Sequence, residues 1–283
     1  MAISLPLSIR NCLKYVASVL HQKECASLEA EILLSLALNS TRSHLHAWPD
    51  KKIDNMSMVR LQEFIARRNS GEPIAYITGC KEFWSLKIEV NRDTLVPRPE
   101  TEVLIEKALT LFSRQDKICV ADLGTGSGAI AFALASERPN STVHASDICH
   151  NALNMAKKNK VQLQLNNVTF FHGDWCSALP HFNYDMLVSN PPYISESEWE
   201  YYQDGLTVEP KHALLSGYDG LFAIRLICQQ APHYLKPKGY LLVEHGFLQG
   251  EAVRTIFASM GFSNVETVCD LSSHERVTVG RRY

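Results

Sequence analysis

The sequence has no Cys-x-x-Cys pair, no excess of basic charge and no long apolar segment. Its eight cysteines lie far apart along 283 residues, which excludes zinc-ligand spacing and indicates a reducing compartment. Lys and Arg number 28 against 30 Asp and Glu, so the net charge of −2 provides no basic field for a polyanion. No uncharged apolar run approaches the roughly 18 residues of a membrane helix. The N-terminus has no charged segment ahead of an apolar stretch, so we expect no signal peptide. We expect a cytoplasmic protein that binds no metal and contacts no membrane.

The composition is that of an ordinary globular protein. Hydrophobic residues make up 46% of the chain and charged residues 20%, which excludes disordered, collagen-like and coiled-coil proteins. A chain of 283 residues can bury a large core without disulfides or structural metals. Its length suggests one large domain, or a large domain with a small partner.

The first 73 residues predict a small helical bundle. Apolar side chains recur at helical spacing at Leu28, Ile32, Leu33 and Leu36, and again at Leu61, Phe64 and Ile65. The break Gly71-Glu72-Pro73 ends this pattern. Alternating apolar residues and a turn glycine then predict a linking β-hairpin in residues 74–97, ahead of a larger domain in residues 98–283. The hairpin pattern consists of Gly79, Leu86, Ile88 and Val90.

The larger domain alternates strands and helices, which is typical of a parallel sheet. A helix is expected from Pro99, whose fixed φ suits the first helical position, through Ala108. The strands are expected at 118–122, 142–147, 168–171, 184–189, 240–244, 265–268 and 277–280. The last two are too close in sequence for a crossover helix, so they should pair antiparallel. The sequence thus predicts an α/β fold with seven strands and a reversed last strand.

A glycine-rich loop lies between the first strand of this sheet and the next helix. It reads Asp122-Leu123-Gly124-Thr125-Gly126-Ser127-Gly128, so the backbone can turn tightly beside the free N–H groups of a helix N-terminus. About twenty residues further on, Asp147 ends the second strand, where a carboxylate can accept both hydroxyls of a ribose. Gly124-x-Gly126-x-x-Ala129 also fits the loose dinucleotide fingerprint, so an NAD-dependent oxidoreductase is an alternative. Gly128 favours S-adenosyl-L-methionine instead, which has no pyrophosphate.

The segment Asn190-Pro191-Pro192-Tyr193 follows an apolar strand and should lie at the sheet edge beside the glycine loop. Its prolines fix φ and remove two N–H donors, so carbonyls are presented without local partners. The Asn190 side-chain oxygen and the Pro191 carbonyl can accept both N–H groups of a primary amide or amine, with Tyr193 as an aromatic wall. We therefore predict that Asn190, Pro191 and Tyr193 are catalytic and direct a nitrogen at a methyl sulfonium.

Four segments together resemble one enzyme family. They are the glycine loop, Asn190-Pro191-Pro192-Tyr193, Pro97-Arg98-Pro99-Glu100-Thr101-Glu102 and Tyr76-x-x-Gly79-x-x-x-Phe83. This combination closely resembles the PrmC/HemK family of class I methyltransferases, which modify the glutamine of the Gly-Gly-Gln motif in peptide chain release factors. The resemblance covers essentially the whole chain. It implies a Rossmann-like, seven-stranded methyltransferase domain behind a small helical domain for substrate recognition, and methylation of the glutamine N5 in support of translation termination.

The resemblance also implies roles for individual residues. The cofactor S-adenosyl-L-methionine, which leaves as S-adenosyl-L-homocysteine, is expected on Gly124, Thr125, Gly126, Ser127, Gly128, Asp147, Ile148, Trp175 and Asn190. The methionine part would lie on the glycine loop, the ribose on Asp147 and the adenine near Ile148 and Trp175. The glutamine amide of the release factor is expected at Asn190, Pro191, Pro192 and Tyr193, with Arg98 and Thr101 as further substrate-binding candidates.

The closest alternative is an adenine-N6 nucleic-acid methyltransferase, which would use the same four residues on an exocyclic amine. Such an enzyme must flip a base and hold flanking phosphates, whereas this chain has one short basic cluster, Lys157-Lys158-Asn159-Lys160, better explained as a solvated helix face. We expect no nucleic-acid substrate. Asp174 either binds the adenine amino group or caps a turn, and Arg98 is either a partner contact or an interdomain ion pair. His44-x-His46 lacks a third metal ligand at a convincing spacing.

Overall fold

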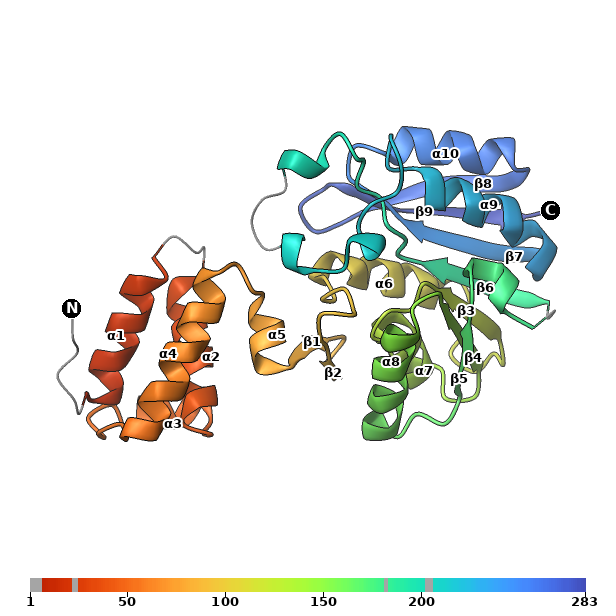
Figure 1. Ribbon diagram of the computed structural model, residues 1–283. Coiled ribbons are helices and arrows are strands. Elements are labelled where there is room, and N and C mark those ends of the chain that lie inside the picture. Colours follow the sequence, from red (N-terminus) through yellow and green to blue (C-terminus); the bar gives the residue numbers. More distant parts are fainter. Residues whose placement is uncertain (1–6, 22–24, 181–182, 202–205) are drawn as a thin grey trace. The chain divides into compact units, whose positions relative to one another are not determined.

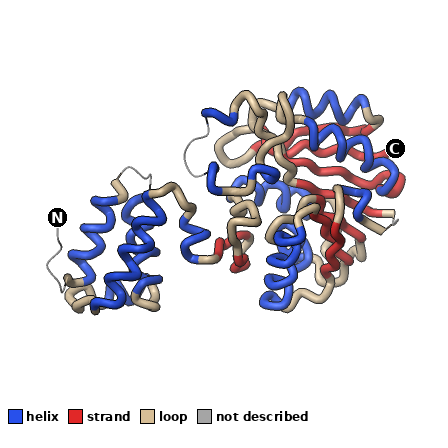
Figure 2. The backbone as a smooth tube through the Cα atoms, in the orientation of Figure 1, coloured by secondary structure: helices blue, strands red, loops and turns tan. Residues whose placement is uncertain are grey.

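The computed structural model describes residues 7–21, 25–180, 183–201 and 206–283. The chain divides into two compact units, Met1–Gly79 and Cys80–Tyr283 (Figure 1). The first is built from helices and the second contains both helices and strands (Figure 2).

The N-terminal unit is the predicted helical bundle. Its helices are α1 (Ile9–Val19), α2 (Ala26–Ala37), α3 (Arg42–Ala47), α4 (Asn55–Asn69) and α5 (Ile74–Thr78). Three begin at side-chain caps, because the oxygens of Ser8, Thr41 and Asp54 each accept a backbone N–H from the first turn. Leu33 and Leu61 are fully buried in its core, but Leu28 is 41% exposed. The helices were therefore predicted correctly, whereas the buried face of α2 was not.

The predicted hairpin is shorter than expected. Residues 74–78 form α5, because Pro73 supplies an extended N-cap and Gly79, at φ +75°, ends the helix in the left-handed conformation. Gly79 is therefore a helix terminator and not the hairpin turn. The hairpin comprises β1 (Cys80–Phe83) and β2 (Leu86–Glu89), joined by Trp84 and Ser85. Both connecting residues have positive φ, as a two-residue turn between right-twisted strands requires.

Within the described residues of the C-terminal unit, seven strands form one sheet in the order β5-β4-β3-β6-β7-β9-β8. The strands are β3 (Cys119–Leu123), β4 (Thr142–Asp147), β5 (Val168–His172), β6 (Tyr184–Ser189), β7 (Leu235–Glu244), β8 (Phe262–Cys269) and β9 (Glu275–Arg282). The first five pair in parallel, and β9 runs antiparallel to both β7 and β8. The predicted α/β fold with a reversed last strand is confirmed. The strands at 240–244, 265–268 and 277–280 were predicted too short.

The strand order reverses direction between β3 and β6, which decides where the helices lie. Right-handed crossovers place α7 (Ala129–Glu137) and α8 (His150–Leu163) on one face, and α9 (Phe222–Tyr234) and α10 (Gly250–Ser259) on the other. Helix α6 (Glu102–Thr110), which follows a 3-10 turn beginning at Pro99, contacts α7. The carboxyl ends of β3 and β6 therefore meet at a switch point, which is where ligands bind in such sheets.

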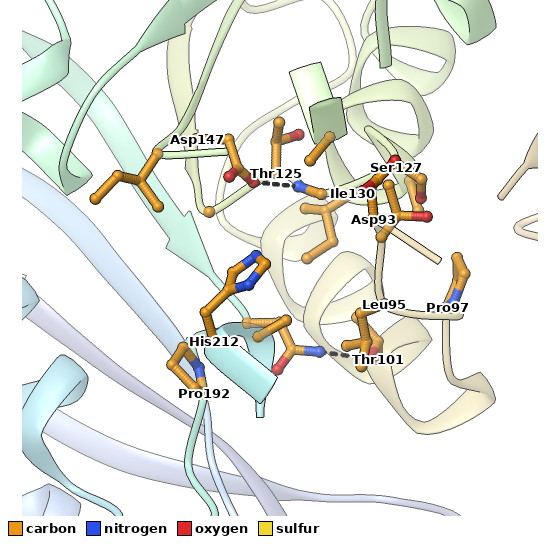
Figure 3. A pocket seen from close by; sticks show the side chains of 18 of the residues that line it. Asp93, Leu95, Pro97, Thr101, Thr125, Ser127, Ile130, Asp147, Pro192 and His212 are labelled. Atoms are coloured by element: carbon orange, nitrogen blue, oxygen red, sulfur yellow. Dashed lines mark hydrogen bonds between the residues drawn. The ribbon is translucent and has the colours of Figure 1, made fainter. Parts of the chain in front are cut away.

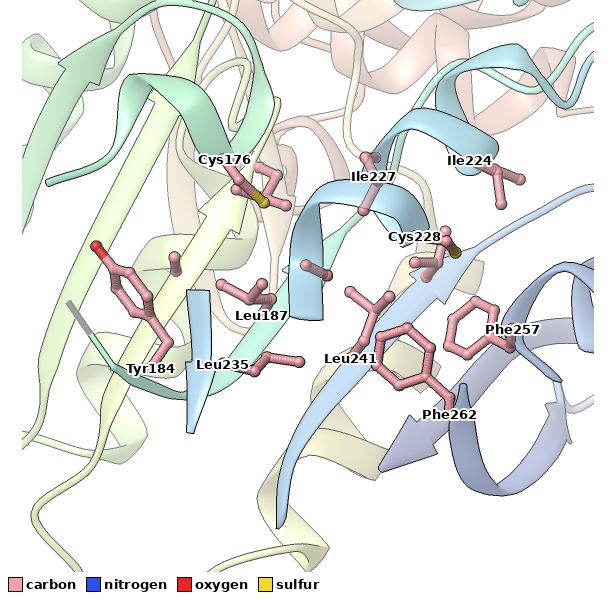
Figure 4. Packing of buried hydrophobic residues seen from close by; sticks show 14 of the residues in the cluster. Cys176, Tyr184, Leu187, Ile224, Ile227, Cys228, Leu235, Leu241, Phe257 and Phe262 are labelled. Atoms are coloured by element: carbon pink, nitrogen blue, oxygen red, sulfur yellow. The ribbon is translucent and has the colours of Figure 1, made fainter. Parts of the chain in front are cut away.

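The core on the α9 and α10 face is closely packed. Apolar side chains from both helices meet the inner residues of β6 and β7 (Figure 4). Phe257 of α10 and Phe262 of β8 pack with ring centroids 5.2 Å apart, beside the fully buried Leu241. Burying an aromatic or aliphatic side chain of this size contributes roughly 1.5–3 kcal/mol, so this layer holds the carboxyl ends of β6 and β7 in place.

Candidate active site

A pocket lies at the carboxyl ends of the parallel strands of the C-terminal unit (Figure 3). It encloses about 860 Å³, including the part open to solvent. Its lining comes from the ends of β1, β3, β4, β5 and β6, the first turns of α7 and α8, the segment before α6 and the loop before α9. The lining residues are Phe83, Asp93, Thr94, Leu95, Pro97, Thr101, Gly124, Thr125, Gly126, Ser127, Ala129, Ile130, Asp147, Ile148, Ala152, Gly173, Asp174, Trp175, Asn190, Pro192, His212 and Ala213.

The glycine loop leaves β3 with three glycines in the left-handed region, at φ +72° for Gly124, +57° for Gly126 and +89° for Gly128. A Cβ on Gly128 would lie 2.3 Å from the Phe132 ring, and one on Gly124 would lie 2.9 Å from the Trp175 ring. Open space surrounds the same position on Gly126. The loop therefore brings bare backbone to the pocket wall beside Trp175, which allows a ligand to approach the backbone closely.

Asp147 closes the other side of this loop from the end of β4. Its two carboxylate oxygens accept the backbone N–H groups of Gly126 and Cys149, each at 2.8 Å. Each oxygen keeps a further lone pair for a ligand donor. Ile148, 61% exposed, and Trp175 also line this end of the pocket. A carboxylate beside two apolar side chains suits a ribose joined to a flat base.

Asp122, a buried residue of β3, stabilises the glycine loop from within the sheet. Its Oδ2 accepts the Thr125 hydroxyl at 2.6 Å and the Ala131 backbone N–H at 3.2 Å. Burial raises the pKa of this carboxyl to about 7, against the lowering effect of those hydrogen bonds. The Asp122 side chain therefore fixes both the loop and the start of α7.

Asn190 leaves β6 at the opposite wall of the pocket. Its Nδ2 donates a hydrogen bond to the Thr101 hydroxyl at 3.1 Å, drawn as a dashed line to Thr101 in Figure 3. The Tyr193 carbonyl accepts from Gln249 Nε2 at 2.9 Å, which anchors the proline segment to the start of α10. Burial raises the pKa of the Tyr193 phenol well above its usual range, so its hydroxyl stays a neutral donor.

A buried carboxylate fastens the segment before α6 to the loop before α9. Glu209 is 4% exposed, accepts the Val96 backbone N–H at 2.9 Å and forms an ion pair with Arg98. His212 and Ala213, a few residues further along the same loop, line the pocket. Glu209 thereby joins two of the segments that form the pocket wall.

Comparisons with known proteins agree over almost the whole chain. The family model described as "PrmC N-terminal domain" matches residues 11–79, and the one described as "Methyltransferase small domain" matches residues 100–208. The release factor glutamine methyltransferase of Coxiella burnetii is 42% identical over 98% of this chain and 99% of its own length. The one from Pseudomonas aeruginosa is 45% identical over 93% of this chain and 95% of its own length.

The chain belongs to the release factor glutamine methyltransferase family. The resemblance noted in the sequence is thereby confirmed, and the oxidoreductase alternative is wrong. Among solved structures, a methyltransferase from Pyrococcus furiosus is similar with a TM-score of 0.54 at 17% identity, covering 77% of this chain and 96% of that one. At that identity the likeness shows the fold alone.

The structure gathers most of the predicted site residues around the methyltransferase pocket. Thr101, Gly124, Thr125, Gly126, Ser127, Asp147, Ile148, Trp175, Asn190 and Pro192 line it. Arg98, Gly128, Pro191 and Tyr193 lie outside the lining. Arg98 forms its ion pair with Glu209 inside the C-terminal unit, so the suggestion of an interdomain pair was wrong.

Other pocket residues were missed by the sequence analysis. Asp93, Thr94 and Leu95 lie in a loop, and His212 lies in the single 3-10 turn Lys211–Ala213. Neither segment has the periodicity of a strand or an α-helix. Asn91-x-Asp93 was a readable signal, because the Asn91 side chain accepts the Asp93 N–H in a local turn. Asp174 stands at the N-cap of a 3-10 turn without a capping hydrogen bond from its side chain and lines the pocket.

The remaining candidate clusters have structural partners. His46 pairs with Glu31 at 3.0 Å, and the described residues contain no group of three or more potential metal ligands. Asn159, within the lysine-rich run, is fully buried and bonds Ser127 and both backbone groups of Glu89, so the run is not simply a solvated helix face. No helix among the described residues is long and apolar enough to cross a membrane.

Proposed function

We propose that the protein transfers the methyl group of S-adenosyl-L-methionine to the side-chain N5 of the glutamine in the Gly-Gly-Gln motif of peptide chain release factors. The observation that carries this proposal is Asn190 at the pocket wall, with its Nδ2 bonded to Thr101. An amide held by its nitrogen directs its oxygen the other way, where it can accept an N–H of a substrate amide. The family to which the chain belongs supports the choice of glutamine.

The residues of the pocket fit S-adenosyl-L-methionine. Positive-φ glycines expose backbone on one wall, the Asp147 carboxylate keeps lone pairs for two ribose hydroxyls, and Ile148 and Trp175 offer apolar surface for adenine. When bound, the cofactor supplies an electrophilic methyl sulfonium and leaves as S-adenosyl-L-homocysteine.

The protein's task in this reaction is to orient a poor nucleophile. The lone pair of an amide nitrogen is delocalised, so the rate depends on holding the nitrogen in line with the methyl group. The Asn190 side-chain oxygen and the Pro191 carbonyl each accept a hydrogen bond from one N–H of the glutamine amide. The Tyr193 ring forms an aromatic wall beside that amide. In this mechanism no side chain acts as a general base, and the proton leaves to water after the nitrogen has gained its methyl.

We assign recognition of the release factor to surfaces outside the cofactor pocket. The described residues of the N-terminal helical unit contribute none of the pocket lining, which suits a role in holding the protein substrate. Pro192 and Thr101 line the pocket near Asn190, and the Arg98 guanidinium, one-third exposed beside its partner Glu209, borders the same segment. We therefore expect a cytoplasmic enzyme that methylates a protein and not a nucleic acid.

Mass spectrometry tests the proposal. Incubating the protein with S-adenosyl-L-methionine and a release factor should add one methyl group to the peptide that contains Gly-Gly-Gln. A release factor with that glutamine replaced by alanine is the matched control and should stay unmodified. Methyl label in DNA or RNA adenine, or on the control factor, would contradict the proposal.

A further inference from the structure

Glu244 lies directly beside Asn190 at the edge of the sheet. Strands β6 and β7 pair in parallel with Ser189 opposite Val243, so the next residue of each chain segment, Asn190 and Glu244, lies at the same level. Glu244 is the last residue of β7 and pairs with Val277 of β9. Glu244 is 1% exposed, although it is a carboxylic acid. Burying such a group is costly unless it has a specific set of partners.

The Glu244 carboxyl is surrounded by groups of the proposed active site. The hydroxyls of Thr101 and Tyr193 lie near enough to lower the pKa of the Glu244 carboxyl as hydrogen-bond donors. Arg276 of β9 lowers the same pKa through its positive charge, and Glu100 raises it. Its Oε2 has no hydrogen-bond partner among the described residues. An apolar side chain of similar volume would fill this space without the cost of desolvating a carboxyl, so packing alone does not account for a glutamate here.

The Thr101 hydroxyl connects Glu244 to Asn190, and it has only one proton to give. When that proton is donated to the Glu244 carboxylate, the Thr101 oxygen can only accept from Asn190. Asn190 must then present Nδ2 to Thr101, as observed at 3.1 Å, and its Oδ1 faces away. Without an acceptor behind it, the same hydroxyl can rotate and donate to Oδ1, so both orientations of the Asn190 amide become accessible.

We propose that Glu244 is a positioning residue that fixes the direction of the Thr101 hydroxyl and thereby keeps Asn190 Oδ1 turned to the acceptor nitrogen. This rests on the proposed function for the identity of the acceptor, but the orientation of Asn190 does not depend on it. The Tyr193 hydroxyl interacts with the same Glu244 carboxyl, so Glu244 also helps to position Tyr193. The ionised form of Glu244 is the one that accepts both hydroxyls.

Protonation of Glu244 reverses this polarity. A protonated carboxyl can donate to the Thr101 oxygen and release the Thr101 proton toward Asn190, which favours the opposite orientation of the amide. Burial raises the pKa of Glu244 to about 7, with Glu100 raising it further and Arg276 and the two hydroxyls lowering it. The active orientation should therefore be lost as the pH falls through this value.

The first test measures the chemical shifts of the Asn190 side-chain NH2 group by nuclear magnetic resonance in the full-length protein. It needs no substrate. In the wild type the Asn190 NH2 signals should shift with pH, with a midpoint near the pKa of Glu244. In Glu244→Gln, which has no ionisable group at this position, that titration should disappear. Persistence of the same titration in Glu244→Gln, or its absence in the wild type, would overturn the proposal.

The second test is kinetic and uses isosteric changes. Thr101→Val and Glu244→Leu should each lower kcat by about 10- to 100-fold, the usual effect of removing an orienting partner, with KM for the release factor nearly unchanged. Because both act through one hydroxyl, the double variant should be no slower than the slower single variant. Thr101→Ser keeps the hydroxyl and should restore kcat. Thr169→Val, the same change on the edge strand β5, is the control and should keep the wild-type kcat and amide titration.

The outcomes separate this inference from the proposed function. Multiplying losses in the double variant, or a wild-type kcat in Thr101→Val, would show that Glu244 does not act through Thr101. A wild type that transfers no methyl to glutamine while its Asn190 signals titrate as expected would refute the proposed function and leave the positioning network standing. If Glu244→Leu fails to fold, the wild-type and Glu244→Gln titrations still decide.

Discussion

At the scale of single residues, Asp147 and Asn190 face the pocket from different strands and hold different parts of the proposed reaction. Asp147 is tied to the glycine loop through the Gly126 N–H, and Asn190 is tied to α6 through Thr101. Each side chain is thus oriented by a bond that leaves its remaining lone pairs for a ligand. This separation allows cofactor binding and methyl transfer to be tested independently.

Replacing Asp147 with alanine should weaken binding of S-adenosyl-L-homocysteine by ~1.5–3 kcal/mol, the usual scale for losing hydrogen bonds to a charged group. Isothermal titration calorimetry measures this directly. NAD should show no measurable binding to either protein. An unchanged affinity in Asp147→Ala would show that the Asp147 carboxylate does not bind the ribose.

Replacing Asn190 with alanine should lower kcat by ~10²–10³, about what the loss of one preorganised hydrogen-bonding group costs. The expected change in KM for the release factor is small, because the protein substrate is held mainly elsewhere. Single-turnover methylation with saturating substrates provides the measurement. A turnover rate equal to that of the wild type would rule out a catalytic role for Asn190.

The buried carboxyl of Asp122 should make stability depend on pH. Its pKa, raised by burial to about 7, lies above the value of the unfolded chain, so the folded state holds the proton more tightly. The stabilisation is complete at acidic pH and is lost as the pH rises through about 7. The Asn variant can keep one oxygen for Thr125 and Ala131 and cannot ionise.

The free energy of unfolding of the wild type, relative to Asp122→Asn, should therefore fall between about pH 4, near the pKa of an unfolded aspartate, and about pH 7, the pKa in the folded chain. Urea denaturation at several pH values measures this difference. Asp219→Asn provides a contrast, because Arg225 lowers the pKa of that exposed carboxyl and its contribution should grow as the pH rises from acid. A pH-independent difference for Asp122→Asn would contradict the argument.

At the scale of structural elements, the glycine loop provides a matched pair of substitutions. Gly126→Ala and Gly128→Ala both place a Cβ at positive φ, which costs roughly 1–2 kcal/mol in each case. The added Cβ meets open space at Gly126 but lies 2.3 Å from the Phe132 ring at Gly128. Gly128→Ala should therefore unfold at clearly lower urea concentration than Gly126→Ala. Equal midpoints would mean that Phe132 moves aside without cost.

At the scale of the whole molecule, the two compact units predict a division of labour. Every pocket-lining residue belongs to the unit Cys80–Tyr283. Deleting residues 1–79 should thus leave affinity for S-adenosyl-L-homocysteine within about three-fold, while methylation of an intact release factor falls by at least about ten-fold, or 1.4 kcal/mol. Calorimetry and initial rates measure these two effects, with circular dichroism as the folding control. Equal activity of both proteins would reduce the N-terminal unit to a stabilising appendage.

The local order of the chain accounts for what the sequence predicted. Strands such as Thr142–Asp147 and Tyr184–Ser189 are short segments between turn signals, and their ends were predicted to the residue. The sequence-based predictions were wrong where one local sequence feature is compatible with two different structures. Gly79 marks a positive φ in either case, and only the surrounding structure makes it a helix end.

By itself the sequence determined the doubly wound sheet, the glycine loop and the proline segment after β6, because each depends on the backbone preferences of neighbouring residues. It did not determine that Asn190 bonds Thr101, 89 positions away, or that Arg98 pairs with Glu209, 111 positions away. Nor did it single out Glu244, the last residue of an ordinary apolar strand. These contacts arise because the carboxyl ends of separate strands meet at one edge of the sheet, and periodicity along a chain carries no information about which distant side chains meet there.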